Sequence, residues 1–74
     1  MKKNLLEIIN EILEENGMDL LEKLEDNDDL INDIGLDSLD LALLTAMIEE
    51  EYGIDVFENK IIRKVFEIKE LINE

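Results

Sequence analysis

Helical spacing of the apolar residues, which no proline interrupts, is the feature that most constrains how this chain folds. In the first segment, about Lys3 to Asn16, leucines and isoleucines recur at the spacing that places them on one face of a helix. This apolar face consists of Leu5, Ile8, Ile9, Ile12 and Leu13. Gly17 follows, where a helix commonly ends in a left-handed residue. Nowhere do apolar and polar residues alternate as in a half-buried strand, so we predict an all-α fold.

A second helix is predicted from about Ser38 to Tyr52, with its end at Gly53. At about 100° per residue, one side of this helix forms a core-facing stripe. The stripe comprises Leu41, Leu44, Thr45, Ile48 and Tyr52. The opposite side of its first half is apolar as well, through Leu39, Ala42, Leu43 and Ala46. A helix with two apolar faces is either buried at the centre of a protein or uses one face on a partner, and in so short a chain we favour a partner.

Two shorter helical pieces, near Glu58 to Arg63 and about Val65 to Asn73, complete the predicted architecture. We therefore expect a small four-helix bundle with three main helices and one short helix. A long loop, Met18 to Leu36, joins the first two helices. The 74 residues suffice for a single domain, residues 1–74.

The composition excludes several classes of function. Without cysteine or histidine, the chain cannot form a thiol nucleophile, an imidazole base or a zinc site built on these residues. Its net charge of −14 disfavours nucleic acids and anionic membranes and favours basic protein partners. No apolar run is long enough to cross a bilayer, so we expect a cytoplasmic protein. The run Asp26 to Asp29 lacks the ligand spacing of a calcium-binding EF-hand, and no metal site is predicted.

Ser38, the only serine, stands at the start of the second predicted helix. A serine there commonly serves as the N-cap, a role that Asp37 could fill instead. Because the chain offers no base except carboxylates and amines, Ser38 cannot act as a catalytic nucleophile, and no catalytic residue is predicted. An exposed hydroxyl at the positive end of a helix dipole could, however, carry a phosphodiester, because unpaired backbone N–H groups favour negative charge.

The residues around this serine resemble the acyl carrier protein family. Residues 33 to 40 read Asp-Ile-Gly-Leu-Asp-Ser-Leu-Asp, and the following helix ends Ile-Glu-Glu-Glu-Tyr-Gly-Ile at residues 48 to 54. The family's Asp-Ser-Leu triplet corresponds to Asp37, Ser38 and Leu39, and the resemblance covers nearly the whole chain. It implies that a phosphopantetheinyl transferase moves 4′-phosphopantetheine from coenzyme A onto Ser38. The thiol of this arm would hold acyl groups as thioesters in fatty-acid or in specialised polyketide or aminoacyl biosynthesis, and the carrier itself would not be an enzyme.

The resemblance also assigns a role to the second apolar face of the helix. This face becomes a docking surface for acyl-transferring and synthase enzymes with basic patches, and we expect the carrier to be a monomer. The surface comprises Leu39, Asp40, Ala42, Leu43, Ala46, Glu49 and Glu50. An acyl chain folded back between helices would be lined by Leu44, Ile48, Ile61 and Ile62, although ordinary core packing explains these four equally well.

The chain departs from the family at some positions, and its sequence is also compatible with other functions. Leu43 stands where fatty-acid carriers usually have a glutamate, and Lys64 replaces a capping threonine. An unmodified small acidic helical interaction domain is the main alternative, with Ser38 as a helix cap only. A carboxylate-based hydrolase or metal enzyme ranks last, because a bundle this small offers little concavity for a substrate.

Overall fold

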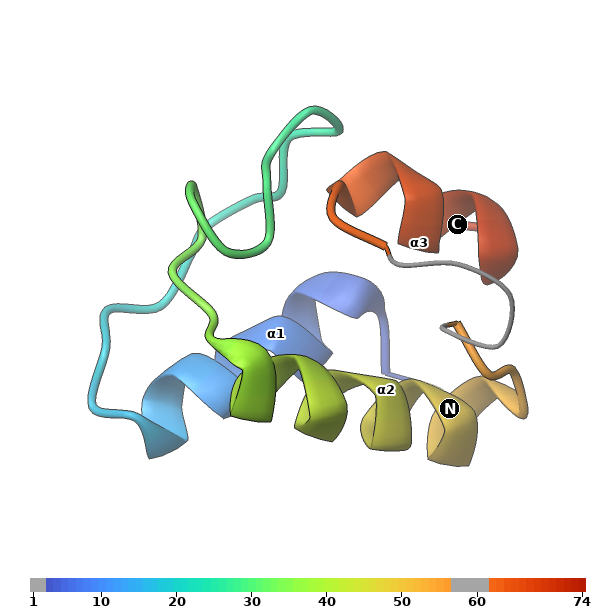
Figure 1. The fold of residues 1–74 in the computed structure, drawn as a ribbon, viewed down its shortest axis with the longest axis horizontal. Helices are drawn as coiled ribbons and strands as arrows, with labels where there is room; N and C mark the ends of the chain where they lie inside the picture. Colours follow the sequence, from blue (N-terminus) through green and yellow to red (C-terminus); the bar gives the residue numbers. More distant parts are fainter. Residues whose placement is uncertain (1–2, 57–61) are drawn as a thin grey trace.

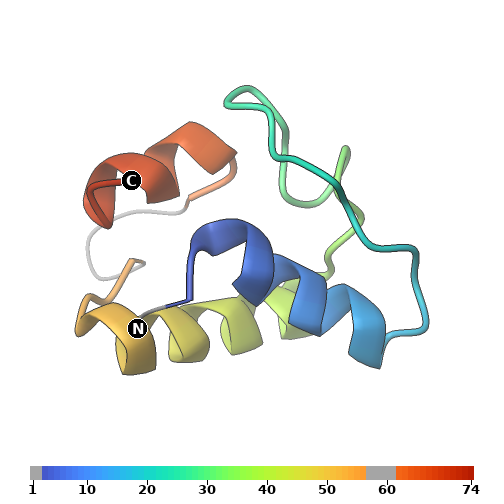
Figure 2. The same cartoon turned by 180° about the vertical axis from the view of Figure 1, so that it is seen from behind.

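The computed structural model describes residues 3–56 and 62–74 of the chain. Helix α1 spans Leu5–Glu15, α2 spans Ser38–Tyr52 and α3 spans Val65–Leu71, so the predicted all-α class is confirmed. Helices α1 and α2 lie side by side in both views, and α3 lies on the side of the N-terminal end of α1 (Figures 1 and 2). Among the described residues, no helix is both long and apolar enough to span a membrane.

The fourth, short helix stays a prediction. It was expected near Glu58 to Arg63, and most of that stretch falls in residues 57–61, which lie outside the described residues. Its last two positions, Ile62 and Arg63, are not helical. The structure therefore gives three helices in the part of the chain that it describes.

Helix α1 begins two residues later than predicted because Asn4 forms its N-cap. The Asn4 Oδ1 atom accepts a hydrogen bond from the Glu7 N–H at 2.8 Å, and the Glu7 Oε1 atom accepts one from the Asn4 N–H at 3.3 Å. This reciprocal capping box pairs two backbone donors that the first turn leaves open. At the other end Asn16 is the C-cap, followed by Gly17 at φ 71°.

The two remaining helices end as local chemistry requires. Helix α2 has the predicted bounds and stops at Gly53, whose φ of 70° is left-handed. Helix α3 stops at Leu71, earlier than the predicted Asn73, because Ile72 forms its C-cap and Asn73 turns left-handed at φ 61°. Lys64 supplies no side-chain cap to α3, in agreement with the loss of the threonine, but its N–H donates to Glu67 Oε1 at 3.1 Å.

The core lies among the three helices and draws on every part of the described chain. Helix α1 supplies five buried side chains, α2 two and α3 two, and residues between the helices and after α3 supply the others. The buried apolar residues are Leu5, Ile8, Ile9, Ile12, Leu13, Leu30, Ile34, Leu36, Leu44, Ile48, Val56, Ile62, Val65, Ile68 and Ile72.

Residues 16–37, which connect α1 to α2, are joined by backbone hydrogen bonds to the start of α3. Asp29 and Lys64 form an isolated antiparallel bridge, and the Leu30 N–H donates to the Arg63 carbonyl at 2.7 Å. The buried Asp29 carboxylate accepts from two N–H groups of its own turn, those of Ile31 and Asn32, both at 2.9 Å, and pairs with Arg63 at 3.3 Å. These donors, that of Asn32 foremost, hold the pKa of Asp29 below its usual value.

Contacts between distant residues also join the ends of the helices. The carboxylate of Glu74 accepts a hydrogen bond from the Leu5 N–H at 3.1 Å, at the positive end of α1. The Tyr52 hydroxyl, at the end of α2, donates to the Lys3 carbonyl at 2.6 Å. Partial burial and the nearby Glu74 carboxylate raise the pKa of Tyr52. The three helices are thus connected close to the start of α1.

Candidate functional site

The segment that enters α2 is held by an alternation of buried and exposed residues. Ile34 and Leu36 are buried, whereas Gly35 and Asp37 face outward. The Leu36 N–H donates to the Leu30 carbonyl at 3.0 Å, which ties the segment to the preceding turn. Gly35 has a φ of 98°, and the Met18 methyl carbon lies 3.0 Å from the place where a Cβ atom would stand. The positive φ therefore favours glycine at this position, and a Cβ atom would in addition have to displace the Met18 methyl group.

Asp37, and not Ser38, is the N-cap of α2. The Asp37 Oδ1 atom accepts from the Asp40 N–H at 2.8 Å, and the Asp40 Oδ2 atom accepts from the Asp37 N–H at 3.2 Å. The sequence left both residues open for this role, and the structure decides for the aspartate. As the first residue of the helix, Ser38 is left exposed, and its hydroxyl makes no hydrogen bond to any residue that the structure describes.

Two backbone N–H groups, those of Ser38 and Leu39, lie close to the Ser38 hydroxyl. The Asp40 N–H is taken by the cap, and the Leu41 N–H donates to the Asp37 carbonyl at 2.9 Å. Within residues 3–56 and 62–74, the N–H groups of Ser38 and Leu39 have no acceptor. An exposed hydroxyl beside two unpaired N–H groups at a helix N-terminus can carry and stabilise an anionic substituent. The residues present therefore fit a phosphodiester on Ser38.

A contact from α1 that sequence reasoning missed steadies the first turn of α2. The side-chain amide of Asn16 donates to both carboxylate oxygens of Asp40 at 3.0 Å. Since Asp40 also closes the capping box, Asn16 connects the end of α1 to the residues around Ser38. The sequence indicated Asn16 only as the end of a helix, because nothing local predicts a partner 24 positions away.

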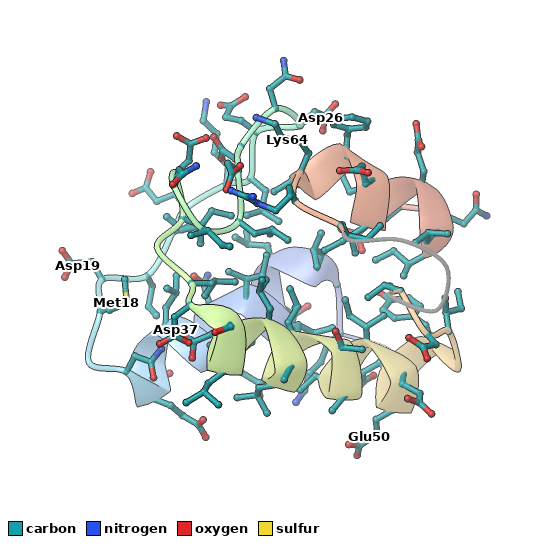
Figure 3. All side chains as sticks on the ribbon, viewed as in Figure 1. Met18, Asp19, Asp26, Asp37, Glu50 and Lys64 are labelled. Carbon is teal, nitrogen blue, oxygen red and sulfur yellow. The ribbon has the colours of Figure 1, made fainter. Side chains whose placement is uncertain are left out.

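The predicted docking residues lie along α2, and the structure leaves most of them accessible. Leu39 is 80% exposed and Leu43 39%, and the two alanines are exposed too. Asp40 is half-buried, whereas Glu49 and Glu50 are exposed. In Figure 3, Asp37 lies just before the start of this surface and Glu50 lies at its other end. At 1.5 Å per residue, the acidic end of the surface at Glu50 lies about 18 Å along the helix from Ser38.

The residues suggested as an acyl-chain lining are core residues in this structure. Leu44, Ile48 and Ile62 are fully buried and belong to one cluster, and Ile61 lies outside the described residues. A chain that entered here would have to separate α2 from the segment around Ile62. Among the described residues, no group of three or more acidic side chains is arranged to hold a metal ion.

Comparison with protein families gives one further finding. The chain matches the family model described as "Phosphopantetheine attachment site" over residues 3–71. This interval contains Ser38 and all three described helices. Comparisons with curated proteins and with solved structures gave no significant match.

Proposed function

The chain belongs to the phosphopantetheine attachment site family, and from this premise we propose that it is an acyl carrier protein modified on Ser38. Members of this family carry covalently attached 4′-phosphopantetheine and are carriers rather than enzymes. The observation that carries the choice of residue is the free hydroxyl of Ser38. Because Asp37 performs the capping, Ser38 is exposed and available for modification. Thr45 carries the other aliphatic hydroxyl, but it is half-buried and its hydroxyl donates to the Leu41 carbonyl at 2.9 Å. It is therefore a poorer attachment point than Ser38.

The residues around Ser38 would each have a distinct part in holding the arm. The N–H groups of Ser38 and Leu39 would donate to the phosphate, and Asp37 keeps the helix end ordered through its cap. The Asn16–Asp40 hydrogen bonds hold the first turn in place against α1. When attached, the arm supplies a thiol, which this cysteine-free chain lacks, for the formation of acyl thioesters.

The partners follow from the surface of α2. Leu39, Ala42, Leu43 and Ala46 present apolar area, and acidic residues border it. Enzymes with an apolar site and a basic rim would match it: the phosphopantetheinyl transferase, then acyl-transferring and synthase enzymes. We propose that residues 1–74 act as one monomeric carrier in the cytoplasm. The pathway is that of fatty acids or a specialised polyketide or aminoacyl product, and Leu43, in place of the usual glutamate, favours dedicated partners.

Intact mass spectrometry tests this proposal directly. The protein is incubated with coenzyme A and a promiscuous phosphopantetheinyl transferase, and we expect a mass gain of one phosphopantetheine group. Ser38→Ala should abolish the gain, whereas Thr45→Ala, which removes the only other aliphatic hydroxyl, should retain it. If the unaltered protein gains no mass while the same enzyme loads a known carrier, the chain is an unmodified interaction domain instead.

A further inference from the structure

A groove between α1 and α2 is not explained by the modification of Ser38. It is a cavity of about 250 Å³ lined by Lys3, Glu11, Ile12, Glu15, Leu43 and Met47. Its apolar part consists of Ile12 from α1 and of Leu43 and Met47 from α2. We call these six residues the α1–α2 groove. Only Leu43 belongs also to the α2 docking surface described above. Leu43 is 39% exposed and Met47 is half-buried, whereas Ile12 is 1% exposed, so the accessible apolar area of the groove comes from α2.

Two further hollows share lining residues with the α1–α2 groove. One shares Glu11 and Glu15 and adds Glu14. The other shares Lys3 and Met47 and adds Glu50 and Glu51. The combined depression follows the two helices, and α2 with its 15 residues is about 22 Å long. This length corresponds to about four turns of an α-helix.

The charges that border the α1–α2 groove are almost all negative. The hollows are bordered by Glu11, Glu14, Glu15, Glu50 and Glu51. Of the described residues that line these hollows, Lys3 is the single base, and its ammonium group is held by both oxygens of Glu11 at 2.8 and 3.0 Å. The remaining carboxylates therefore leave the groove with a net negative charge and an apolar floor.

The combination of an apolar floor and an acidic border selects one kind of occupant. A second copy of the chain carries a net charge of −14 and would be repelled, as would an anionic lipid surface. An apolar acyl chain would leave the carboxylates unpaired and remain partly in water. A helix with apolar side chains on one face and lysine or arginine on its flanks satisfies the floor and the border together.

We propose that the α1–α2 groove binds a cationic amphipathic helix of a partner protein. That this partner is an enzyme served by the carrier rests on the proposed function. The match between the groove and a cationic helix rests only on the residues that line the groove. The apolar ridge of the helix would contact Leu43 and Met47 and lie above the buried Ile12. Its basic side chains would pair with Glu14 and Glu15 on one side and with Glu50 on the other.

A synthetic peptide provides the probe. It is a helix of about 14 residues, with leucine at the i, i+3, i+4 and i+7 positions and lysine at the others. Binding is followed by NMR through the methyl signals of Ile12 and Met47. We expect these signals to shift, and we expect the affinity to fall as the salt concentration rises. A scrambled peptide of the same composition, which has no apolar ridge, should bind at least about fivefold more weakly.

Charge-matched variants separate the groove from general acidity. Glu14→Gln with Glu15→Gln should weaken peptide binding about fivefold. Glu22→Gln with Glu70→Gln removes the same charge at exposed positions away from the groove and should change binding less than about twofold. Equal effects of the two pairs, or equal binding of the scrambled peptide, would overturn the proposal.

Two further results would also overturn it. One is a set of shifts confined to Leu39, Ala42 and Ala46, because the peptide would then occupy only the outer face of α2. The other is that acylation of the protein shifts the methyl signals of Ile12 and Met47 and prevents peptide binding, because the acyl chain would then occupy the groove. Loading of the unaltered protein is measured in parallel. If Ser38 gains no arm the proposed function fails, whereas normal loading without peptide binding removes the groove proposal alone.

Discussion

Helices α1 and α2 lie side by side, yet they use their apolar residues in opposite ways. Helix α1 buries five side chains out of 11 residues, and α2 buries only two out of 15. At about 2 kcal/mol for each fully buried aliphatic side chain, this amounts to about 10 kcal/mol from α1 and about 4 kcal/mol from α2. The longer helix thus contributes less to the core, because it keeps Leu39 and Leu43 at the surface. Helix α1 contributes most to the core, and α2 presents a surface and an exposed hydroxyl.

The same substitution in both helices tests this comparison with the largest expected effect. Leu13 of α1 is 1% exposed and Leu39 of α2 is 80% exposed. Leu13→Ala should lower the free energy of unfolding by about 3 kcal/mol, because it leaves a cavity in the core. Leu39→Ala should change it by less than about 0.5 kcal/mol. Urea unfolding followed by circular dichroism measures both, and losses of similar size would refute the division between the helices.

The glycines that follow α1 and precede α2 should differ in their tolerance of alanine. Gly35→Ala should cost about 2 kcal/mol, because its φ of 98° is strained for an L-residue and the Met18 methyl carbon lies close by. Gly17→Ala should cost about 1 kcal/mol, because its φ is 71° and no atom lies within 4 Å of the added Cβ. Thermal unfolding of both variants checks the order. A larger loss at Gly17 would contradict this account of the entry to α2.

The exposed residues of α2 should matter for partners and not for folding. Leu39→Ala and Leu43→Lys should each lower the rate of Ser38 loading about tenfold at limiting enzyme, because apolar anchors dominate docking. Leu20, which is 53% exposed on the connection, is the matched control, and Leu20→Ala should leave the rate unchanged. Loading followed by intact mass gives the rates. Normal rates in both α2 variants would remove the docking surface from the proposal.

Substitutions in the two capping boxes can separate the contribution of the Asp37 cap to stability from the contribution of its negative charge. Asn4→Ala in α1 and Asp37→Ala in α2 should each cost about 1 kcal/mol in unfolding free energy. Asp37→Asn keeps the capping oxygen and should cost less than about 0.5 kcal/mol. Calorimetric unfolding distinguishes the three variants. If Asp37→Asn costs as much as Asp37→Ala, the negative charge and not the cap stabilises the start of α2.

A substitution of Asp29, in the connection between α1 and α2, should have the smallest effect on the free energy of unfolding, and this effect should depend on pH. The folded-state pKa of Asp29 is lowered by its N–H donors and Arg63, so its ionised form stabilises the fold. This contribution is fully present above the unfolded pKa of about 3.9 and is lost as the pH falls through the lower folded value. Asp29→Asn should therefore be less stable than the unaltered protein at pH 7, and the gap should narrow below about pH 4. Urea midpoints across this range measure the gap, and a constant gap would exclude a role for the carboxylate charge.

Features that depend on neighbouring residues were predictable from the sequence. The five apolar residues predicted for the face of α1 are the five that the structure buries, and the predicted bounds of α2 agree with Ser38–Tyr52. Gly17 and Gly53 adopt the left-handed backbone expected at helix ends. These predictions succeeded because helical periodicity and end signals lie within a few residues of the positions that they describe.

Contacts between distant residues could not be predicted. The hydrogen bond from Arg63 to Asp29 joins residues 34 positions apart. The bonds from Asn16 to Asp40 and from Leu5 to Glu74 span 24 and 69 positions. Each depends on how complete segments pack, and no local pattern specifies that. The α1–α2 groove was missed for the same reason, since Ile12 and Met47 come from different helices.

By itself the sequence determined the helical class, the acidic charge and the placing of Ser38 at the start of a helix. Each of these follows from composition or from residues close together in the chain. The tertiary structure alone decided that Asp37 takes the cap while Ser38 stays exposed, and that Asn16 bonds to Asp40 across 24 positions. Burial and hydrogen-bond partners depend on distances in space, and these exist only once the segments have packed.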